Sequence, residues 1–238
     1  MFNNKHYWQV NREERFYCSL LAHALLGSTQ VRRDFSHLVE SKTGLSLPNT
    51  DCEVYIEAAV LRDYWHDLGD PDAYSDETHQ RRGEVLKIIL SIYDISPSTL
   101  DDHDLFWTTK QKQKLWSPGR WSEEALKTAG LETLIPVKWA FNAKPDIMIV
   151  SGSMVLLIEA KVESGEGREG EGGYQQYEIQ KLVARLYQLL IPNYTDVNTT
   201  VLALETTNGI TWQEVVPIIE RSEIDRFTKQ CLAQLRRY

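Results

Sequence analysis

Three charged side chains near the middle of the chain have the types and the spacing of a metal-dependent hydrolytic site. Asp146 follows Pro145, and Glu159 and Lys161 lie at the end of a second apolar run. Two carboxylates that face each other repel unless a positive charge lies between them. A divalent cation with hard oxygen ligands supplies that charge, and a neighbouring ammonium can hold a water against it.

The two apolar runs that carry these residues are predicted to form a buried β-hairpin. Both runs are rich in Ile, Val and Leu, and the turn Gly152–Ser153 separates them. If this turn is a two-residue hairpin loop, the register places Asp146 opposite Glu159, with β-carbons about 4.5–5.5 Å apart. Because strand side chains alternate with a period of two, Lys161 turns to the same face as Glu159.

The simpler alternative is a surface ion pair between Glu159 and Lys161, with Asp146 as an ordinary turn residue after Pro145. That interpretation is the usual one for an isolated Glu-x-Lys pattern. Here the pattern ends a fully apolar strand, and the hairpin register adds a third polar group on the same face. We therefore favour a site.

Pro145-Asp146, twelve further residues and then Glu159-Ala160-Lys161 resemble the signature of the PD-(D/E)XK nuclease superfamily, which includes many restriction and repair endonucleases. The resemblance implies that Asp146 and Glu159 bind Mg²⁺, for which Mn²⁺ can substitute. It also implies that the carbonyl of Ala160 adds a metal ligand and that Lys161 positions or activates the attacking water.

Members of this family often carry a further acidic residue on the helix before the hairpin. Apolar spacing predicts a helix over residues 9–27, and Glu13 and Glu14 lie near its start. Acidic residues in a first helical turn also complement the helix dipole without any other role. We favour Glu14 as a metal ligand. Tyr17, Cys18 and Leu21 follow it at helical spacing and are apolar, so Glu14 should lie along the buried face of the helix.

The family commonly has a Gln, followed four residues later by a Tyr, on the helix after the hairpin. The apolar stripe of residues 174–190 predicts that helix. The chain departs from the pattern, because Gln176 is followed four positions later by a second glutamine, Gln180. We assign Gln176 a catalytic role by this resemblance, which covers about residues 131–205.

The segment 163–173 is rich in Gly and Glu. No Gly-Lys-Ser/Thr follows its glycines, and its glutamates would repel phosphate, so a nucleotide-binding loop is disfavoured. A flap at the mouth of the site and an inert linker are the remaining interpretations, and we favour the flap.

Residues 110–121 mix cations with two tryptophans and a Pro-Gly turn. This combination can pair phosphate contacts with base stacking. Solubility for the charges and core packing for the tryptophans are the commoner roles of such residues. The predicted nucleic-acid contacts are Lys110, Lys112, Lys114 and Arg120.

The composition favours one large α/β domain, since the chain has 238 residues of which 42% are hydrophobic. A net charge of −8 argues against nucleic-acid affinity over the whole surface but allows a local basic groove, helped by a homodimer or a protein partner. Three separated cysteines and six histidines without metal-ligand spacing argue against a disulfide scaffold or a zinc ribbon. No apolar run of 18 residues is present, so we expect a soluble cytoplasmic protein without a membrane partner.

The order of predicted elements indicates a mixed sheet flanked by helices, and the resemblance implies that this α/β fold is restriction-endonuclease-like. Residues 28–130 are expected to form a largely helical insertion or elaboration within a single domain, 1–238. On the first strand, Glu53 and Glu57 would share a solvated face. The predicted elements are a helix over 9–27, a connector over 28–50 with at most one helical turn, a strand over 52–60, a helix over 85–93, a strand over 134–139, the hairpin, a helix over 174–190, a strand over 199–204, and helices capped at Ser122, Thr211 and Ser222.

The resemblance and the predicted site together imply a magnesium-dependent phosphodiesterase. A DNA endonuclease is the favoured form, and RNA is left open as a substrate. The competing hypothesis is a nuclease-like fold that acts as a binding or assembly module without catalysis. The negative net charge and the irregular glutamine pattern favour that competitor.

Overall fold

The computed structural model describes residues 13–47, 52–69, 75–109, 112–162, 168–169, 174–203 and 209–237. Its α-helices are α1 (Glu14–Gly27), α2 (Thr29–Thr43), α3 (Val60–Asp67), α4 (Asp76–Ile92), α5 (Thr99–Asp102), α6 (Glu123–Thr128), α7 (Ile135–Asn142), α8 (Gln176–Leu190), α9 (Trp212–Arg221) and α10 (Arg226–Leu232). Its strands are β1 (Glu53–Ile56), β2 (Ile147–Ser151), β3 (Met154–Ala160), β4 (Arg168–Glu169), β5 (Tyr174–Gln175), β6 (Asp196–Ala203) and β7 (Ile210–Thr211). Short 3₁₀ helices are η2 (Asp104–Phe106), η3 (Pro118–Arg120), η4 (Glu132–Leu134) and η5 (Ala233–Arg237).

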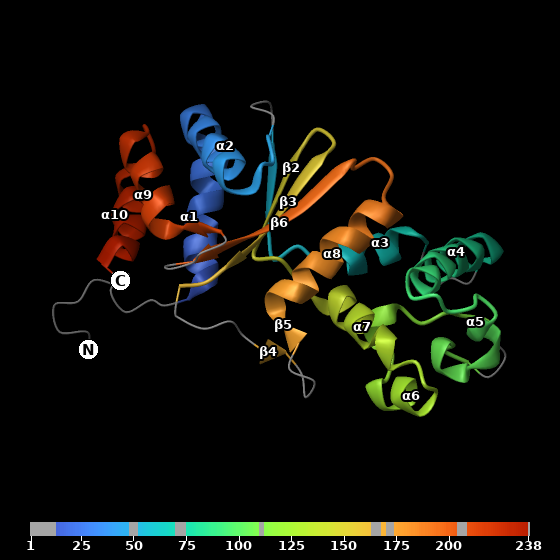
Figure 1. The fold of residues 1–238 in the computed structure, drawn as a ribbon. Helices are drawn as coiled ribbons and strands as arrows, with labels where there is room; N and C mark the ends of the chain where they lie inside the picture. Colours follow the sequence, from blue (N-terminus) through green and yellow to red (C-terminus); the bar gives the residue numbers. More distant parts are fainter. Residues whose placement is uncertain are drawn as a thin grey trace.

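Five strands form one mixed sheet in the order β1-β2-β3-β6-β7 (Figure 1). β2 runs antiparallel to both β1 and β3, whereas β6 runs parallel to β3 and to β7. Because parallel neighbours need a crossover connection, α8 lies between β3 and β6 in the chain. The predicted hairpin register is confirmed, since Ser151 pairs with Met154 and Ile147 with Ile158.

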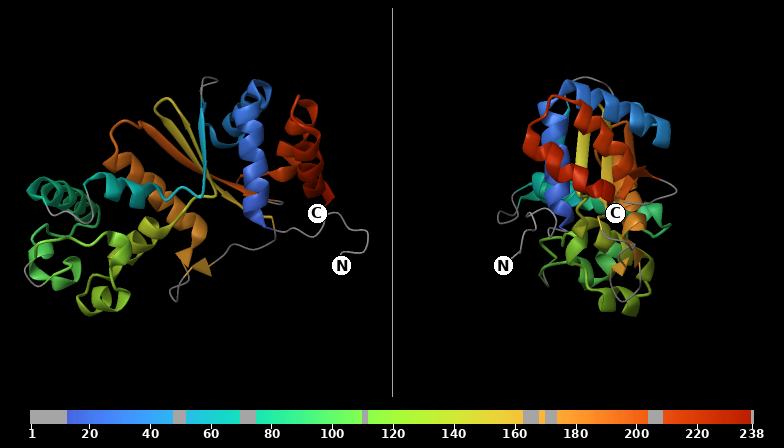
Figure 2. Two further views of the ribbon diagram at one scale, coloured as in Figure 1. Left: turned by 180° about the vertical axis from the view of Figure 1, so that it is seen from behind. Right: turned by 90° about the vertical axis from the view of Figure 1, so that its left-hand side faces the viewer.

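Two layers of helices cover the two faces of the sheet. α1, α2, α9 and α10 pack on one face, and they stand in front of the sheet in the right-hand view of Figure 2. α3, α7 and α8 cover the other face (Figure 1). Leu156 and Ile158 of β3 point into the first layer, and Val155 and Leu157 point into the second. By this alternation Glu159 belongs to the face that α8 covers.

The predicted α/β class is confirmed, because the structure has a mixed five-stranded sheet flanked by helices. Within residues 28–130, the expected insertion, β1 is an edge strand of the sheet and α2 belongs to a helical layer. α4, α5 and α6 instead extend the layer of α7 and α8 away from the sheet (Figure 1). The segment therefore contributes both to the sheet itself and to a helical extension beyond it.

The prediction of a connector over residues 28–50 is wrong, because this segment contains α2. Val31, Phe35 and Val39 recur every four residues and are buried, which gives the helix one narrow apolar stripe. Ser28 caps the helix by accepting a hydrogen bond from the Val31 N–H at 3.3 Å. The polar residues around the stripe hid this periodicity in the sequence.

Two strand predictions also need correction. Residues 134–139 were expected as a strand but belong mainly to α7, whose first turn accommodates Pro136 because no hydrogen bond from that nitrogen is needed there. The strand expected over 52–60 is shorter, since β1 ends at Ile56 and α3 begins at Val60. The chain thus reaches the hairpin through a helix.

Caps of the last helices are partly as predicted. Thr211 and Glu214 form the expected capping box, with Glu214 Oε2 accepting from the Thr211 N–H at 2.9 Å. The final helix was expected to begin at Ser222. Instead Asp225 is its cap, and it accepts a hydrogen bond from the Thr228 N–H at 2.9 Å.

Candidate active site

The end of the β2–β3 hairpin brings Asp146 and Glu159 together below the surface. Asp146 is 8% exposed and Glu159 is 3% exposed. They are the next opposing positions after Ile147 and Ile158, so both side chains lie on the face that α8 covers. Asp146 Oδ2 accepts a hydrogen bond from the Ala160 N–H at 2.7 Å, which fixes this carboxylate at the end of β3.

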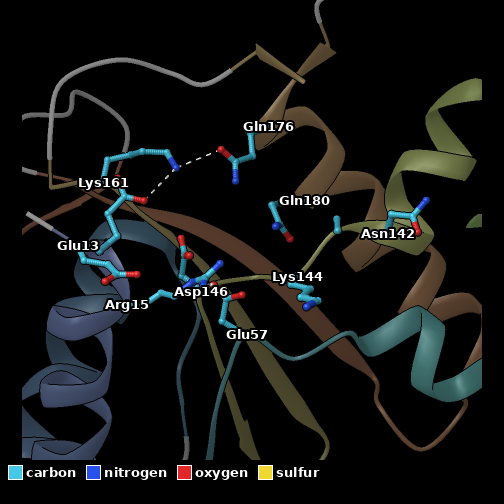
Figure 3. A pocket seen from close by; sticks show the side chains of 11 residues that line it. Glu13, Arg15, Glu57, Asn142, Lys144, Asp146, Lys161, Gln176 and Gln180 are labelled. Atoms are coloured by element: carbon cyan, nitrogen blue, oxygen red, sulfur yellow. Dashed lines mark hydrogen bonds and ion pairs between the residues drawn. The ribbon is translucent and has the colours of Figure 1, made fainter. Parts of the chain in front are cut away.

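Lys161 joins the carboxylates to two helices. Its Nζ donates to Glu159 Oε1 at 2.6 Å. It also donates to Gln176 Oε1 at 3.1 Å, as Figure 3 shows. The same nitrogen lies 3.6 Å from Glu14 Oε2. One ammonium therefore contacts groups from β3, α8 and α1, and of these only Glu14 of α1 is distant in the sequence.

α1 contributes Glu14 to this cluster. Besides its contact with Lys161, Glu14 Oε1 accepts a hydrogen bond from the Val162 N–H at 3.4 Å. Glu13 stands at the N-cap of the helix and also lines the cleft. The contact with Lys161 supports Glu14 as a member of the site.

These groups line a polar cleft with a volume of about 540 Å³, within the range of ligand pockets. Figure 3 shows Lys161 and Glu13 on one side, Asp146 in the middle, and Lys144 and Asn142 on the other side. The lining residues are Glu13, Glu14, Arg15, Glu57, Asn142, Ala143, Lys144, Asp146, Lys161, Gln176 and Gln180. Glu159 is buried and is not part of this lining.

Burial is the largest cause that raises the pKa of both central carboxyl groups. Burial raises the pKa of Asp146 to about 6, against the lowering effects of the Ala160 N–H and Lys161. Burial, and then the charge of Asp146, raise the pKa of Glu159 to about 7. Burial alone would lower the pKa of Lys161, but Glu159 and the other carboxylates raise it overall. Ionising both central acids is therefore unfavourable without a further positive charge.

The donor set fits a hard divalent cation. Asp146, Glu159 and the Ala160 carbonyl would be its ligands, with Glu14 beside them. In the part of the chain that the structure describes, no group of three or more His, Cys, Asp or Glu side chains is arranged to hold a metal ion. A cation here would depend on two carboxylates, a carbonyl and water, and Mg²⁺ commonly binds proteins through one or two carboxylates while keeping several waters.

Glu57 and Arg15 are cleft residues that the sequence analysis did not assign to the site. Arg15 Nε donates to Glu57 Oε1 at 3.1 Å. Glu57 was expected on a solvated strand face, but it follows β1 with a φ of 54°, and its N–H donates to the Asp146 carbonyl at 3.2 Å. Such strained backbone is often retained at functional sites. The pairing of β1 with β2 brings Glu57 here, and no local pattern in the sequence signals that pairing.

The predicted nucleic-acid contacts lie outside the lining of the cleft. Lys110 is not among the described residues. Lys112 donates to a backbone carbonyl of α5, Lys114 is half-buried, and Arg120 is exposed. The structure does not bring the three described cations into the cleft.

The two tryptophans of this basic segment differ in exposure. Trp121 is 1% exposed and belongs to the core, so it is not available for base stacking. Trp116 is half-buried, and the Arg120 guanidinium lies over its ring, 5.6 Å from the centroid. Asn142 Nδ2 donates to the Gly119 carbonyl at 2.8 Å, which ties this segment to the wall of the cleft.

The flap predicted over residues 163–173 lies outside the described residues except for β4. β4 pairs with β5, which leads directly into α8. The role of a flap therefore stays a prediction.

Among the described helices, none combines the length and the apolar composition of a membrane-spanning segment. The chain matches no protein-family model, and comparisons with curated proteins and with solved structures found no match either. Inference about function therefore depends on the geometry of the cleft.

Proposed function

We propose that this protein is a magnesium-dependent nuclease that hydrolyses phosphodiester bonds, with DNA as the favoured substrate. The observation that carries the proposal is the convergence of Asp146, Glu159 and Lys161 at the end of one hairpin, beside a polar cleft. Their spacing resembles the signature of the PD-(D/E)XK superfamily. The mixed sheet flanked by helices is compatible with the restriction-endonuclease-like fold of that family.

Asp146, Glu159 and the carbonyl of Ala160 would hold Mg²⁺, with Glu14 next to them. When bound, Mg²⁺ would stabilise the negative charge that develops on the phosphate during hydrolysis. Carboxylate and carbonyl oxygens also suit Mn²⁺, so Mn²⁺ should substitute. The raised pKa values of both acids support this assignment, because a bound cation would relieve their repulsion.

Lys161 would orient the attacking water. Its raised pKa keeps the amine protonated near neutral pH, so the ammonium donates hydrogen bonds and does not accept a proton. Gln176 Oε1 accepts one of these hydrogen bonds at 3.1 Å and so directs the ammonium. In the reaction the water oxygen bonds to phosphorus and gives one of its protons to bulk water, the bond from phosphorus to the leaving oxygen breaks, and the leaving oxygen takes up a proton from bulk water.

Lys144 and Arg120 are the cations that we propose for contacts with the nucleic-acid backbone. Lys144 is exposed and lines the cleft. Arg120 is exposed and follows Gly119, whose carbonyl binds Asn142 on the cleft wall. Such phosphate contacts supply affinity without base specificity, so they serve DNA and RNA alike. A homodimer or a protein partner would offset the net charge of −8.

A binding or assembly module without catalysis is the second candidate function. The observation that favours it is the charge of the cleft, because carboxylates outnumber cations in its lining and would repel phosphate when no metal is bound. The acids are Glu13, Glu14, Glu57 and Asp146, and the cations are Arg15, Lys144 and Lys161.

Cleavage of supercoiled plasmid DNA by the full chain with Mg²⁺ or Mn²⁺ separates the two functions, with a structured RNA assayed in parallel. The wild type should nick the plasmid, and Asp146→Ala and Lys161→Ala should abolish nicking while the thermal unfolding transition remains. Lys181→Ala is the matched control, because Lys181 is exposed on α8 and pairs with Glu178.

Undiminished cleavage by both site variants would contradict the nuclease assignment. Absence of nicking at high protein concentration, together with absence of calorimetric heat on adding Mg²⁺, would favour the binding module instead.

A further inference from the structure

α8 brings a second glutamine, Gln180, to the cluster one turn after Gln176. Gln180 is 2% exposed, so its amide is withdrawn from bulk water although it borders the cleft. Its Nε2 donates a hydrogen bond to Glu159 Oε2 at 3.2 Å. Figure 3 shows Gln180 between Asp146 and the wall that carries Asn142.

The two oxygens of Glu159 have different partners. Lys161 donates to Oε1 at 2.6 Å, and Gln180 donates to Oε2 at 3.2 Å. Together they fix the plane of the carboxylate, because rotation about its last bond would break both hydrogen bonds. Without Gln180, only the contact at Oε1 would remain to orient the group.

The amide of Gln180 is not optimal for the stability of the fold. Its Oε1 is buried and has no hydrogen-bond partner among the residues that the structure describes. A buried acceptor without a partner loses its hydration and gains nothing in return. Methionine has a similar shape and would fill the same space without that loss.

We propose that Gln180 is a positioning residue, which holds the Glu159 carboxylate in the orientation that binds a divalent cation. The inference rests on the proposed function, because it concerns the metal ligand Glu159. Groups that orient a metal ligand typically change metal affinity or activity by about 10- to 100-fold when they are removed.

The test is calorimetric titration of the metal-free full chain with Mn²⁺, without nucleic acid, for the wild type and Gln180→Met. The variant should bind Mn²⁺ at least about 10-fold more weakly. Its thermal unfolding temperature in EDTA should stay close to that of the wild type, because removal of the unpaired acceptor offsets the loss of the hydrogen bond to Glu159. If Gln180 only packed in the core, its replacement would change Mn²⁺ affinity and unfolding temperature together.

Gln188→Met is the matched control, since Gln188 is exposed on the same helix and its Nε2 donates to the Thr195 carbonyl, away from the cleft. Its Mn²⁺ affinity should equal that of the wild type. Gln180→Asn is a second variant, too short to keep the hydrogen bond with Glu159, and it carries the test if Gln180→Met does not fold. It should weaken Mn²⁺ binding to a similar extent.

Mn²⁺ affinity within twofold of the wild type in a folded Gln180 variant would overturn the positioning role. A parallel loss of unfolding temperature and affinity in both variants would overturn it as well and show that Gln180 supports packing. A wild type that does not bind Mn²⁺ would refute the proposed function, and the inference with it. Wild-type binding that survives in the variants would refute the inference alone.

Discussion

Glu159 and Glu214 each lie 2.6 Å from a lysine ammonium, yet their pKa values shift in opposite directions. The pKa of Glu159, which pairs with Lys161 in the cleft, is raised to about 7. The pKa of Glu214, which pairs with Lys42 where α9 meets α2, is lowered. The length of an ion pair therefore does not tell whether its acid stabilises the fold.

The surroundings of the two acids explain the difference. The side chain of Glu214 is 32% exposed. Its partial burial alone would raise the pKa, but Lys42 and the N–H and hydroxyl of Thr211 outweigh that effect. The side chain of Glu159 is 2% exposed, and burial together with the charge of Asp146 outweighs Lys161.

The comparison distinguishes a structural ion pair from a cluster that is strained by its own charge. At the start of α9, hydrogen bonds favour the ionised acid. In the cleft, the folded protein holds carboxylates together against their repulsion, which is the expected property of a site that is completed by a cation.

Glu159→Gln should have the largest effect on activity and the opposite effect on stability. Removing a proposed metal ligand should reduce magnesium-dependent cleavage at least about 10²-fold, as for other groups that stabilise transition-state charge. At pH 8 in EDTA the variant should unfold at a higher temperature, because one buried repulsive charge is gone. Plasmid nicking and thermal unfolding measure the two effects.

The control for this variant is Glu178→Gln, because Glu178 is exposed on α8 and pairs with Lys181 at 2.7 Å. Both readouts should match the wild type. A lower unfolding temperature for Glu159→Gln at pH 8 would mean that the ion pair with Lys161 outweighs the cost of burial. Glu159 would then stabilise the fold as Glu214 does, which contradicts the comparison.

The stability of the metal-free protein should fall with rising pH through the range in which Glu159 ionises. Because its folded pKa of about 7 exceeds its ordinary value of 4.5, the folded state binds the proton more tightly than the unfolded state. The free energy of unfolding should thus decline between these pH values, by at most about 1.4 kcal/mol per pH unit for this group.

Urea unfolding in EDTA from pH 4 to pH 8 measures this decline, which should be shallower in Glu159→Gln than in the wild type. Adding Mg²⁺ at pH 8 should stabilise the wild type, because the cation binds only the folded state. Equal pH dependence in the two proteins would show that Glu159 is not held at a raised pKa.

Glu214→Gln should give the smallest effect, with the opposite sign to Glu159→Gln. Removing the charge beside the start of α9 should lower the free energy of unfolding by roughly 0.5 kcal/mol at pH 7 and leave cleavage unchanged. Because the folded pKa of Glu214 lies below its ordinary value, this contribution is lost as the pH falls through the folded pKa.

Urea unfolding of the wild type and Glu214→Gln at pH 7 and pH 3 checks this expectation. The difference between the two proteins should shrink at pH 3. If Glu214→Gln instead stabilises the protein at pH 7, the ionised Glu214 carboxylate opposes folding, as that of Glu159 does.

The centre of the site could be predicted from the sequence because its determinants are local. Two apolar runs around Gly152–Ser153 specify the hairpin, and the two-residue turn fixes its register. That register alone places Asp146 and Glu159 at opposing positions. The helix with Gln176 follows from an apolar stripe of ordinary helical period.

Other parts could not be predicted, because they depend on contacts between distant segments. The pairing of β1 with β2 brings Glu57 beside Asp146 and has no signal in the sequence near Glu57. The apolar stripe of α2 is too narrow to signal a helix in the sequence, and Pro136 disfavours a helix except in a first turn, the position that it has in α7. The burial of Trp121 in the basic segment could not be predicted either, because it depends on tertiary packing.

The site joins neighbours on the chain to one distant residue. Gln176 is 15 positions from Lys161, and Gln180 is 21 positions from Glu159, whereas Glu14 is 148 positions from Val162, whose N–H it binds. Closing the longer loop costs more chain entropy. A ligand that binds Glu14 and Glu159 together would link α1 to the β2–β3 hairpin. Its affinity would therefore depend on the correct folding of both segments.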